Sequence, residues 1–184
     1  MKLQWKSRLH RMVVAGVFAA LLAVLSQISI PLPTGIPVTL QTFAVALCGF
    51  ALGPGLGTAA VGVYLALGAV GIPVFAGFSG GIGSFVGMTG GYLWAFLPMA
   101  FLCGLGARQK NRALALTVGF LGLVVCHLCG SFQFALVSAV SPWNAFLLAS
   151  APYLLKDAAS LVVAYLAAVA ILRSLEKARL VTLV

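Results

Sequence analysis

Lys156 and Asp157 are the residues of this chain best able to carry chemistry, because both are ionisable and both lie in an apolar stretch, residues 151–164. The only other carboxylate in the sequence is that of Glu176. Charged side chains inside a membrane segment are costly, and they usually face a cavity or the protein interior. An ammonium group holds anions, and a carboxylate accepts hydrogen bonds from N–H donors. The pair therefore predicts a ligand-binding site.

The spacing of these residues predicts two separate contacts with a ligand. Adjacent side chains on a helix point about 100° apart, so Lys156 and Asp157 do not form a simple pair one turn apart. Ser160 lies one turn after Lys156 on the same face. Two alternatives remain: the charges are structural and are satisfied by backbone and loop groups, or Lys156 extends outward to water.

The other reactive side chains form no catalytic or metal-binding pattern. Cys126, His127 and Cys129 provide three potential ligands but no fourth partner nearby. All four cysteines lie in apolar stretches, where a free cysteine packs as a small apolar residue. The chain has no Walker-type phosphate loop and no zinc-protease helix. We therefore expect neither an enzyme nor a bound metal or cofactor.

The composition predicts a membrane protein. The chain is 62% hydrophobic and 7% charged, which leaves too little polar side chain to cover a soluble domain. The long apolar runs do not alternate with polar residues, so they favour helices over a β-barrel. The net charge of +9 does not indicate nucleic acid, because the basic residues flank the apolar segments.

The apolar runs predict one all-α membrane domain, residues 1–184, with six transmembrane helices. The expected spans are about residues 12–30, 38–52, 57–76, 91–106, 113–138 and 152–172, with a short interfacial helix at about 142–149. Prolines in 31–37, the Gly53–Pro54–Gly55 turn and glycines in 76–91 separate them. Asp157 would then lie about 7–8 Å into the last helix, near one membrane face.

The basic residues predict the orientation of the chain. All but Lys156 fall in three clusters: Lys2, Lys6, Arg8 and Arg11; Arg108, Lys110 and Arg112; and Arg173, Lys177 and Arg179. With six helices these clusters share one side, so the positive-inside rule places both termini inside, N-in/C-in. The proline-rich loop, the glycine-rich loop and the Lys156–Asp157 pair then gather at the outer face.

The first apolar segment carries small residues four apart, at Ala15, Ala19 and Ala23. Such a stripe allows another helix to pack closely. It predicts either a docking face for another membrane subunit or internal packing within this bundle.

Five blocks of the chain resemble the BioY family, the biotin-binding S component of energy-coupling factor (ECF) vitamin transporters. They are residues 36–45 (IPVTLQTFAV), 52–57 (LGPGLG), 71–77 (GIPVFAG), 79–81 (SGG) and 89–92 (TGGY). The resemblance implies the ECF S-component fold and capture of biotin at the outer face of a prokaryotic plasma membrane, within the lipid bilayer. It also implies ATPase subunits that energise uptake through a transmembrane coupling subunit docked on the first helix.

The resemblance also assigns roles to the charged pair. In the family, an aspartate early in the last helix bonds the biotin ureido group, and Asp157 matches it. The lysine that meets the biotin carboxylate commonly lies three residues later, where this chain has Ser160. Lys156 instead precedes the aspartate, but it lies one helical turn from Ser160, so its ammonium can reach the same region.

The remaining candidates follow from the chemistry of biotin, which has N–H donors, a carbonyl, an apolar bicycle and an anionic tail. Polar candidates are Thr39, Gln41 and Ser79, of which Gln41 or Ser79 would donate to the carbonyl. Phe75, Tyr92 and Trp94 would supply aromatic surface, although each alone also suits core or lipid contact. Two other functions stay open: a transporter that works without an ATPase, and a structural or assembly protein with no ligand.

Overall fold

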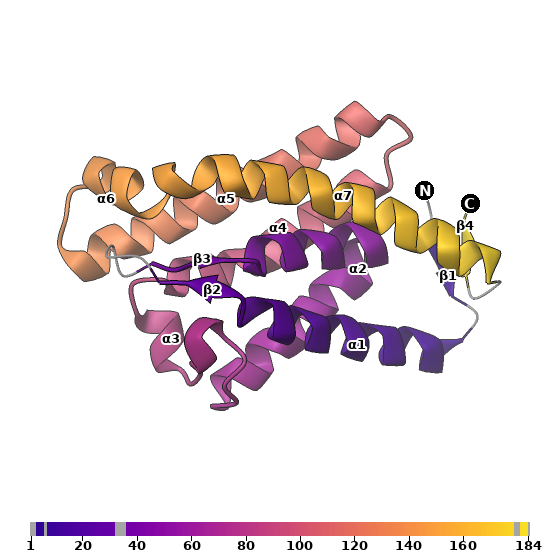
Figure 1. The fold of residues 1–184 in the computed structure, drawn as a ribbon, viewed down its shortest axis with the longest axis horizontal. Coiled ribbons are helices and arrows are strands. Elements are labelled where there is room, and N and C mark those ends of the chain that lie inside the picture. The colour runs from indigo at the N-terminus through magenta and orange to yellow at the C-terminus, as the bar shows by residue number, and fades with distance from the viewer. Residues whose placement is uncertain (1–2, 6, 32–35, 179–180, 184) are drawn as a thin grey trace.

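Long helices lying along a common axis make up most of the computed structural model, which describes residues 3–5, 7–31, 36–178 and 181–183 (Figure 1). The helices are α1 (Arg8–Ser26), α2 (Gln41–Ala69), α3 (Gly83–Val86), α4 (Gly90–Ala107), α5 (Arg112–Ser138), α6 (Pro142–Ala149) and α7 (Leu154–Lys177), with short 3-10 turns at Ala76–Phe78 and Ala151–Tyr153. Two small antiparallel ribbons pair β1 (Leu3–Trp5) with β4 (Val181–Leu183), and β2 (Ser29–Ile30) with β3 (Val38–Thr39).

The all-α membrane class is confirmed. Within the described residues, five helical segments are long and apolar enough to cross a membrane: α1, α2, α4, α5 and the continuous segment Pro142–Lys177. α2 is not one straight rod, because Gly53 has φ 79° and ψ 176°. A glycine tolerates this positive φ, and the following Pro54 favours extended ψ before it. The count of six spans and the N-in/C-in orientation stay predictions.

Several helix ends differ from the expected ones. α1 spans Arg8–Ser26 and not about residues 12–30. The second half of α2 ends at Ala69 and not near residue 76. Gly71 then takes a positive φ of 98°, and Pro73 prevents the helix from resuming. The last helix begins at Leu154 after the turn at Ala151–Tyr153, and it continues to Lys177. α6 occupies the residues of the expected short helix.

The core forms where α2 packs against α1, α4 and α7, and where α4 packs against α5. Glycines permit the closest approach of α2 and α4: a side chain at Gly49 would overlap the backbone of Ala100, and one at Gly104 would overlap the Gly53–Pro54 turn. Small residues at helix contacts are the usual basis of packing in membranes, where lipid is as apolar as the protein.

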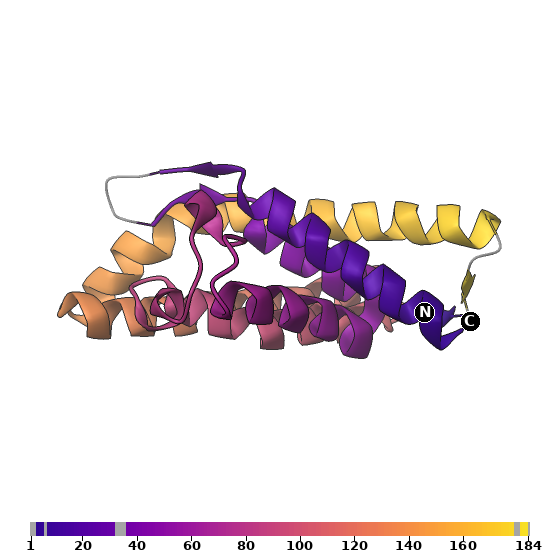
Figure 2. The ribbon, with the colours of Figure 1, turned by 90° about the horizontal axis from the view of Figure 1, so that it is seen from below.

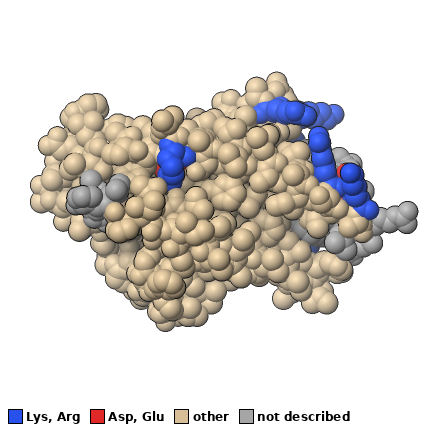
Figure 3. All heavy atoms as spheres, in the orientation of Figure 1, with Lys and Arg blue, Asp and Glu red and all other residues tan. Residues whose placement is uncertain are grey.

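The two ends of the bundle differ in charge. The N- and C-termini lie together at one end, as two perpendicular views show (Figures 1 and 2). The start of α1, the loop between α4 and α5, and the end of α7 lie at the same end. Lys and Arg side chains gather there on the surface, and one separate basic group lies nearer the opposite end (Figure 3).

Candidate binding site

A cavity of about 290 Å³ lies near the end of the bundle opposite the termini. Its volume is close to the lower end of the ~300–1,000 Å³ typical of small-molecule sites. The starts of α2, α4 and α7, the loop after α2 and the middle of α5 contribute to its wall. The predicted site residues that line it are Thr39, Gln41, Phe75, Ser79, Tyr92, Lys156 and Asp157.

Asp157 lies at the cavity in the first turn of α7 and is 4% exposed. The Lys156 ammonium contacts its Oδ1. The same ammonium donates a hydrogen bond to the carbonyl of Thr39, at 2.8 Å. The two adjacent charges therefore meet each other directly, although they are not a pair one helical turn apart. The Cα–Cβ bonds diverge, but the four-carbon stem of lysine is long enough to fold back onto its neighbour.

His127 completes this cluster, and the sequence analysis assigned it no role. Its Nε2 lies 3.3 Å from Asp157 Oδ2, and its ring meets that of Tyr92 edge-on with centroids 6.0 Å apart. Asp157 thus has a basic group beside each oxygen. The sequence signal was present, because a histidine inside a membrane segment is itself a functional-site candidate. Within the described part of the chain, no group of three or more His, Cys, Asp or Glu side chains is placed to hold a metal.

Thr39 and Gln41 form a bonded pair at the start of α2. The Gln41 N–H donates to Thr39 Oγ1 at 3.2 Å, and the Thr39 hydroxyl donates to Gln41 Oε1 at 3.1 Å. Gln41 Nε2 donates to the Tyr64 hydroxyl at 2.9 Å. An amide carries two N–H donors, so Gln41 keeps one for a ligand.

Phe75 lines the cavity and is the member of an aromatic row that does so. Phe75 is buried between Tyr64 and Phe85, with ring centroids 5.3 and 5.6 Å away. Its ring rests on Gly68, where any side chain would overlap it. Trp94 is not among the lining residues: it is 57% exposed and packs on the outer side of Phe85, at 4.9 Å.

The two predicted serines are placed differently. Ser79 lines the cavity, and its hydroxyl donates to the carbonyl of Ala76 at 2.9 Å. Ser160 does not line the cavity, since it lies a turn farther along α7. The structure therefore brings Ser79 to the charged cluster's cavity and leaves Ser160 outside it.

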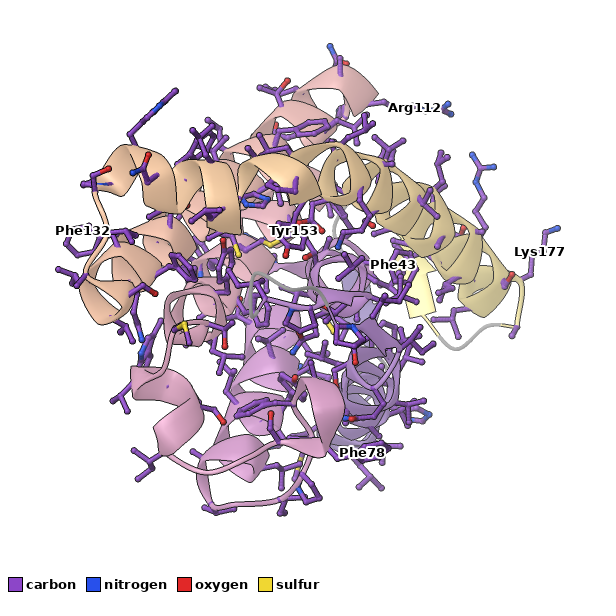
Figure 4. All side chains as sticks on the ribbon, turned by 60° about the vertical axis from the view of Figure 1, so that its left-hand side comes forward. Phe43, Phe78, Arg112, Phe132, Tyr153 and Lys177 are labelled. Atoms are coloured by element: carbon purple, nitrogen blue, oxygen red, sulfur yellow. The ribbon has the colours of Figure 1, made fainter. Side chains whose placement is uncertain are left out.

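Gln27 ties the end of α1 to the loop that carries Phe75. Its Nε2 donates to the carbonyls of Val74 and Phe75, at 3.0 and 3.1 Å, and its Oε1 accepts from the N–H of Phe78 at 2.9 Å. Phe78 has a positive φ of 55°, which is uncommon outside glycine. Figure 4 shows Phe78 at the outside of the molecule and Tyr153 within it.

The small-residue stripe of α1 faces the interior of the bundle. Ala15 and Ala19 are 8% and 2% exposed, and they and Ala23 pack with the core that α1 shares with α2. Ala15 and Ala19 therefore pack inside the bundle, as the second of the two predicted roles requires. Val13 and Val17, on the opposite side of α1, are exposed, and the docking face stays a prediction.

A bundle of apolar helices around a cavity with a buried ionic cluster indicates a multi-pass membrane protein with a cavity of small-molecule size. The chain belongs to the BioY family, whose sequence pattern matches residues 1–177. The resemblance seen in the sequence blocks is thereby confirmed.

Named relatives agree with this assignment. The chain is 44% identical over 142 residues to the "Probable biotin transporter BioY" of Pyrococcus horikoshii, covering 77% of this chain and 83% of that one. It is 46% identical over 125 residues to the "Biotin transporter BioY" of Thermotoga maritima, covering 67% and 73%. Its fold matches a crystal structure of "the S-component for biotin from an ECF-type ABC transporter", with a TM-score of 0.80, 28% identity and 92% of each chain covered. These are transport proteins and not enzymes, as the sequence predicts.

Proposed function

We propose that this protein is a substrate-specificity subunit that binds biotin and serves its uptake across a prokaryotic plasma membrane. The observation that carries the proposal is the buried carboxylate of Asp157, held between Lys156 and His127 at the wall of a cavity of ligand size. Membership in the BioY family supplies the candidate ligand.

The cavity offers a partner for each part of biotin. Asp157 accepts a hydrogen bond from one ureido N–H group, and the free N–H of Gln41 donates to the ureido carbonyl. Phe75 and Tyr92 pack against the apolar bicycle. Lys156 meets the carboxylate of the valerate tail, which requires its ammonium to leave Asp157 and the carbonyl of Thr39.

Uptake in this proposal is energised by ATPase subunits, which act through a transmembrane coupling subunit. No motif of this chain would hydrolyse ATP, and α1 presents an exposed apolar side to the membrane. That side, rather than Ala15 and Ala19, is the proposed contact with the coupling subunit.

Two measurements test this function. Calorimetric titration of the purified chain with a set of vitamins should give tight binding of biotin alone, and failure to bind biotin would refute the proposal. Proteoliposomes that contain only this chain should not accumulate biotin, whereas adding the coupling and ATPase subunits with ATP should start uptake. Uptake by the chain alone would favour the transporter that needs no ATPase.

A further inference from the structure

His127 is a buried polar residue of the cavity that contacts no part of biotin in the proposed function. Its side chain is 6% exposed, and its Nδ1 has no hydrogen-bond partner. Its Nε2 touches Asp157 Oδ2 at 3.3 Å but does not meet hydrogen-bond geometry. Buried polar groups are nearly always hydrogen-bonded, so an unsatisfied ring at a cavity wall indicates a site that is completed when occupied.

The backbone of His127 is held firmly by neighbouring hydroxyls. The His127 carbonyl accepts hydrogen bonds from Ser131 Oγ at 2.7 Å and from Ser150 Oγ at 3.3 Å. Ser150 in turn shares a hydrogen bond of 2.9 Å with the Tyr92 hydroxyl. These bonds join α4, α5 and the segment before α7, so the ring is presented to Asp157 from a braced position.

The two basic partners of Asp157 differ in freedom. The Lys156 side chain is 30% exposed, and its flexible four-carbon stem carries the ammonium that faces Asp157 Oδ1. The His127 side chain is shorter and buried, and its ring faces Asp157 Oδ2. A substrate with N–H donors can displace the flexible ammonium more readily than the braced ring. A buried carboxylate that loses all its partners is strongly destabilised, so one partner must stay.

We propose that His127 is a positioning residue for Asp157: it stays on Oδ2 while one N–H group of the substrate takes Oδ1 from Lys156. The ammonium is then free to meet the carboxylate at the other end of the substrate. This inference rests on the proposed biotin function. It gives the two basic residues different tasks, since His127 serves the ureido end and Lys156 serves the tail.

The test compares biotin with its methyl ester, which keeps the ureido group and lacks the negative charge. Calorimetry on His127→Phe should show affinity for both ligands weakened by a similar factor, about tenfold or more, because a hydrogen bond to a charged group is lost at the shared ureido end. His127→Gln has an amide N–H that can reach Asp157 and should bind both ligands nearly as the wild type does. Lys156→Met should instead weaken biotin much more than the ester.

Controls separate this role from a structural one. Cys126→Ala changes a buried neighbour on α5 and should leave both affinities unchanged. If His127→Phe does not fold, His127→Asn replaces it, because its shorter amide cannot reach Asp157 and should bind weakly where His127→Gln binds well. Unchanged affinity in His127→Phe, or a loss confined to biotin, would overturn the role of His127 and leave the proposed biotin function standing. A wild-type chain that binds neither ligand would overturn the biotin function and this inference with it.

Discussion

Replacing Asp157 with asparagine removes the buried negative charge and keeps the shape of the side chain. Asparagine retains one carbonyl acceptor, but its N–H₂ group cannot accept a hydrogen bond, so one of the two acceptor oxygens beside Lys156 and His127 is lost. At least one charge-assisted hydrogen bond to the ureido group is lost. Such a bond contributes about 1.5–3 kcal/mol, and each 1.4 kcal/mol is tenfold in affinity, so biotin binding should weaken roughly 10- to 150-fold.

Calorimetric titration with biotin measures this change directly, on protein whose folding is checked by thermal unfolding in detergent. Glu176→Gln is the matched control, because it neutralises the other carboxylate of the chain at the opposite, basic end of the bundle. It should bind biotin as the wild type does. Affinity of Asp157→Asn within twofold of the wild type, in a folded protein, would refute the assignment of Asp157 to the ureido group.

Three further substitutions test other parts of the site. Lys156→Met should lower affinity for biotin about 10- to 150-fold and affect biotin methyl ester little, and equal losses in calorimetry would rule out contact with the carboxylate. Gln27→Leu removes hydrogen bonds worth about 0.5–1.5 kcal/mol each, so amide exchange in residues 72–79 should accelerate. Gln109→Leu, which loses only a bond to the Leu105 carbonyl at the end of α4, serves as the control. Equal exchange rates in both variants would contradict the proposed role of Gln27 in holding residues 72–79. Tyr92→Phe removes one hydrogen bond to the buried Ser150 hydroxyl, which keeps Ser131 as a partner, so the unfolding free energy should fall by about 0.5–1.5 kcal/mol. An unchanged melting midpoint would show that the bond adds no stability.

Structural features that depend on residues close together in the chain could be predicted from the sequence. Apolar runs of membrane-spanning length are long helices here, and the Gly53–Pro54 pair interrupts α2 where the sequence places a turn. Asp157 stands out in the sequence because it is a lone carboxylate in an apolar stretch, and it is buried at the cavity. These properties depend on local backbone preferences and on the cost of moving polar groups out of water.

The partners of those residues depend on the packing of the helices. His127 lies on a different helix from Asp157, and only the rotation of α5 against α7 turns its ring toward the carboxylate. The positions of Trp94 and Ala19 also depend on how the helices pack. The sequence leaves either side of their helices open, and packing places Trp94 outside the cavity and Ala19 inside the bundle.

The sequence by itself determined the membrane class and the family, and it singled out Asp157 as a candidate, because each rests on composition or on residues close together in the chain. The tertiary structure decided what Asp157 touches. Lys156 folds back onto it, and His127 reaches it from α5. Such contacts are set by helix rotation and by side-chain rotamers within a packed interior, and neither has a local signature in the order of the residues.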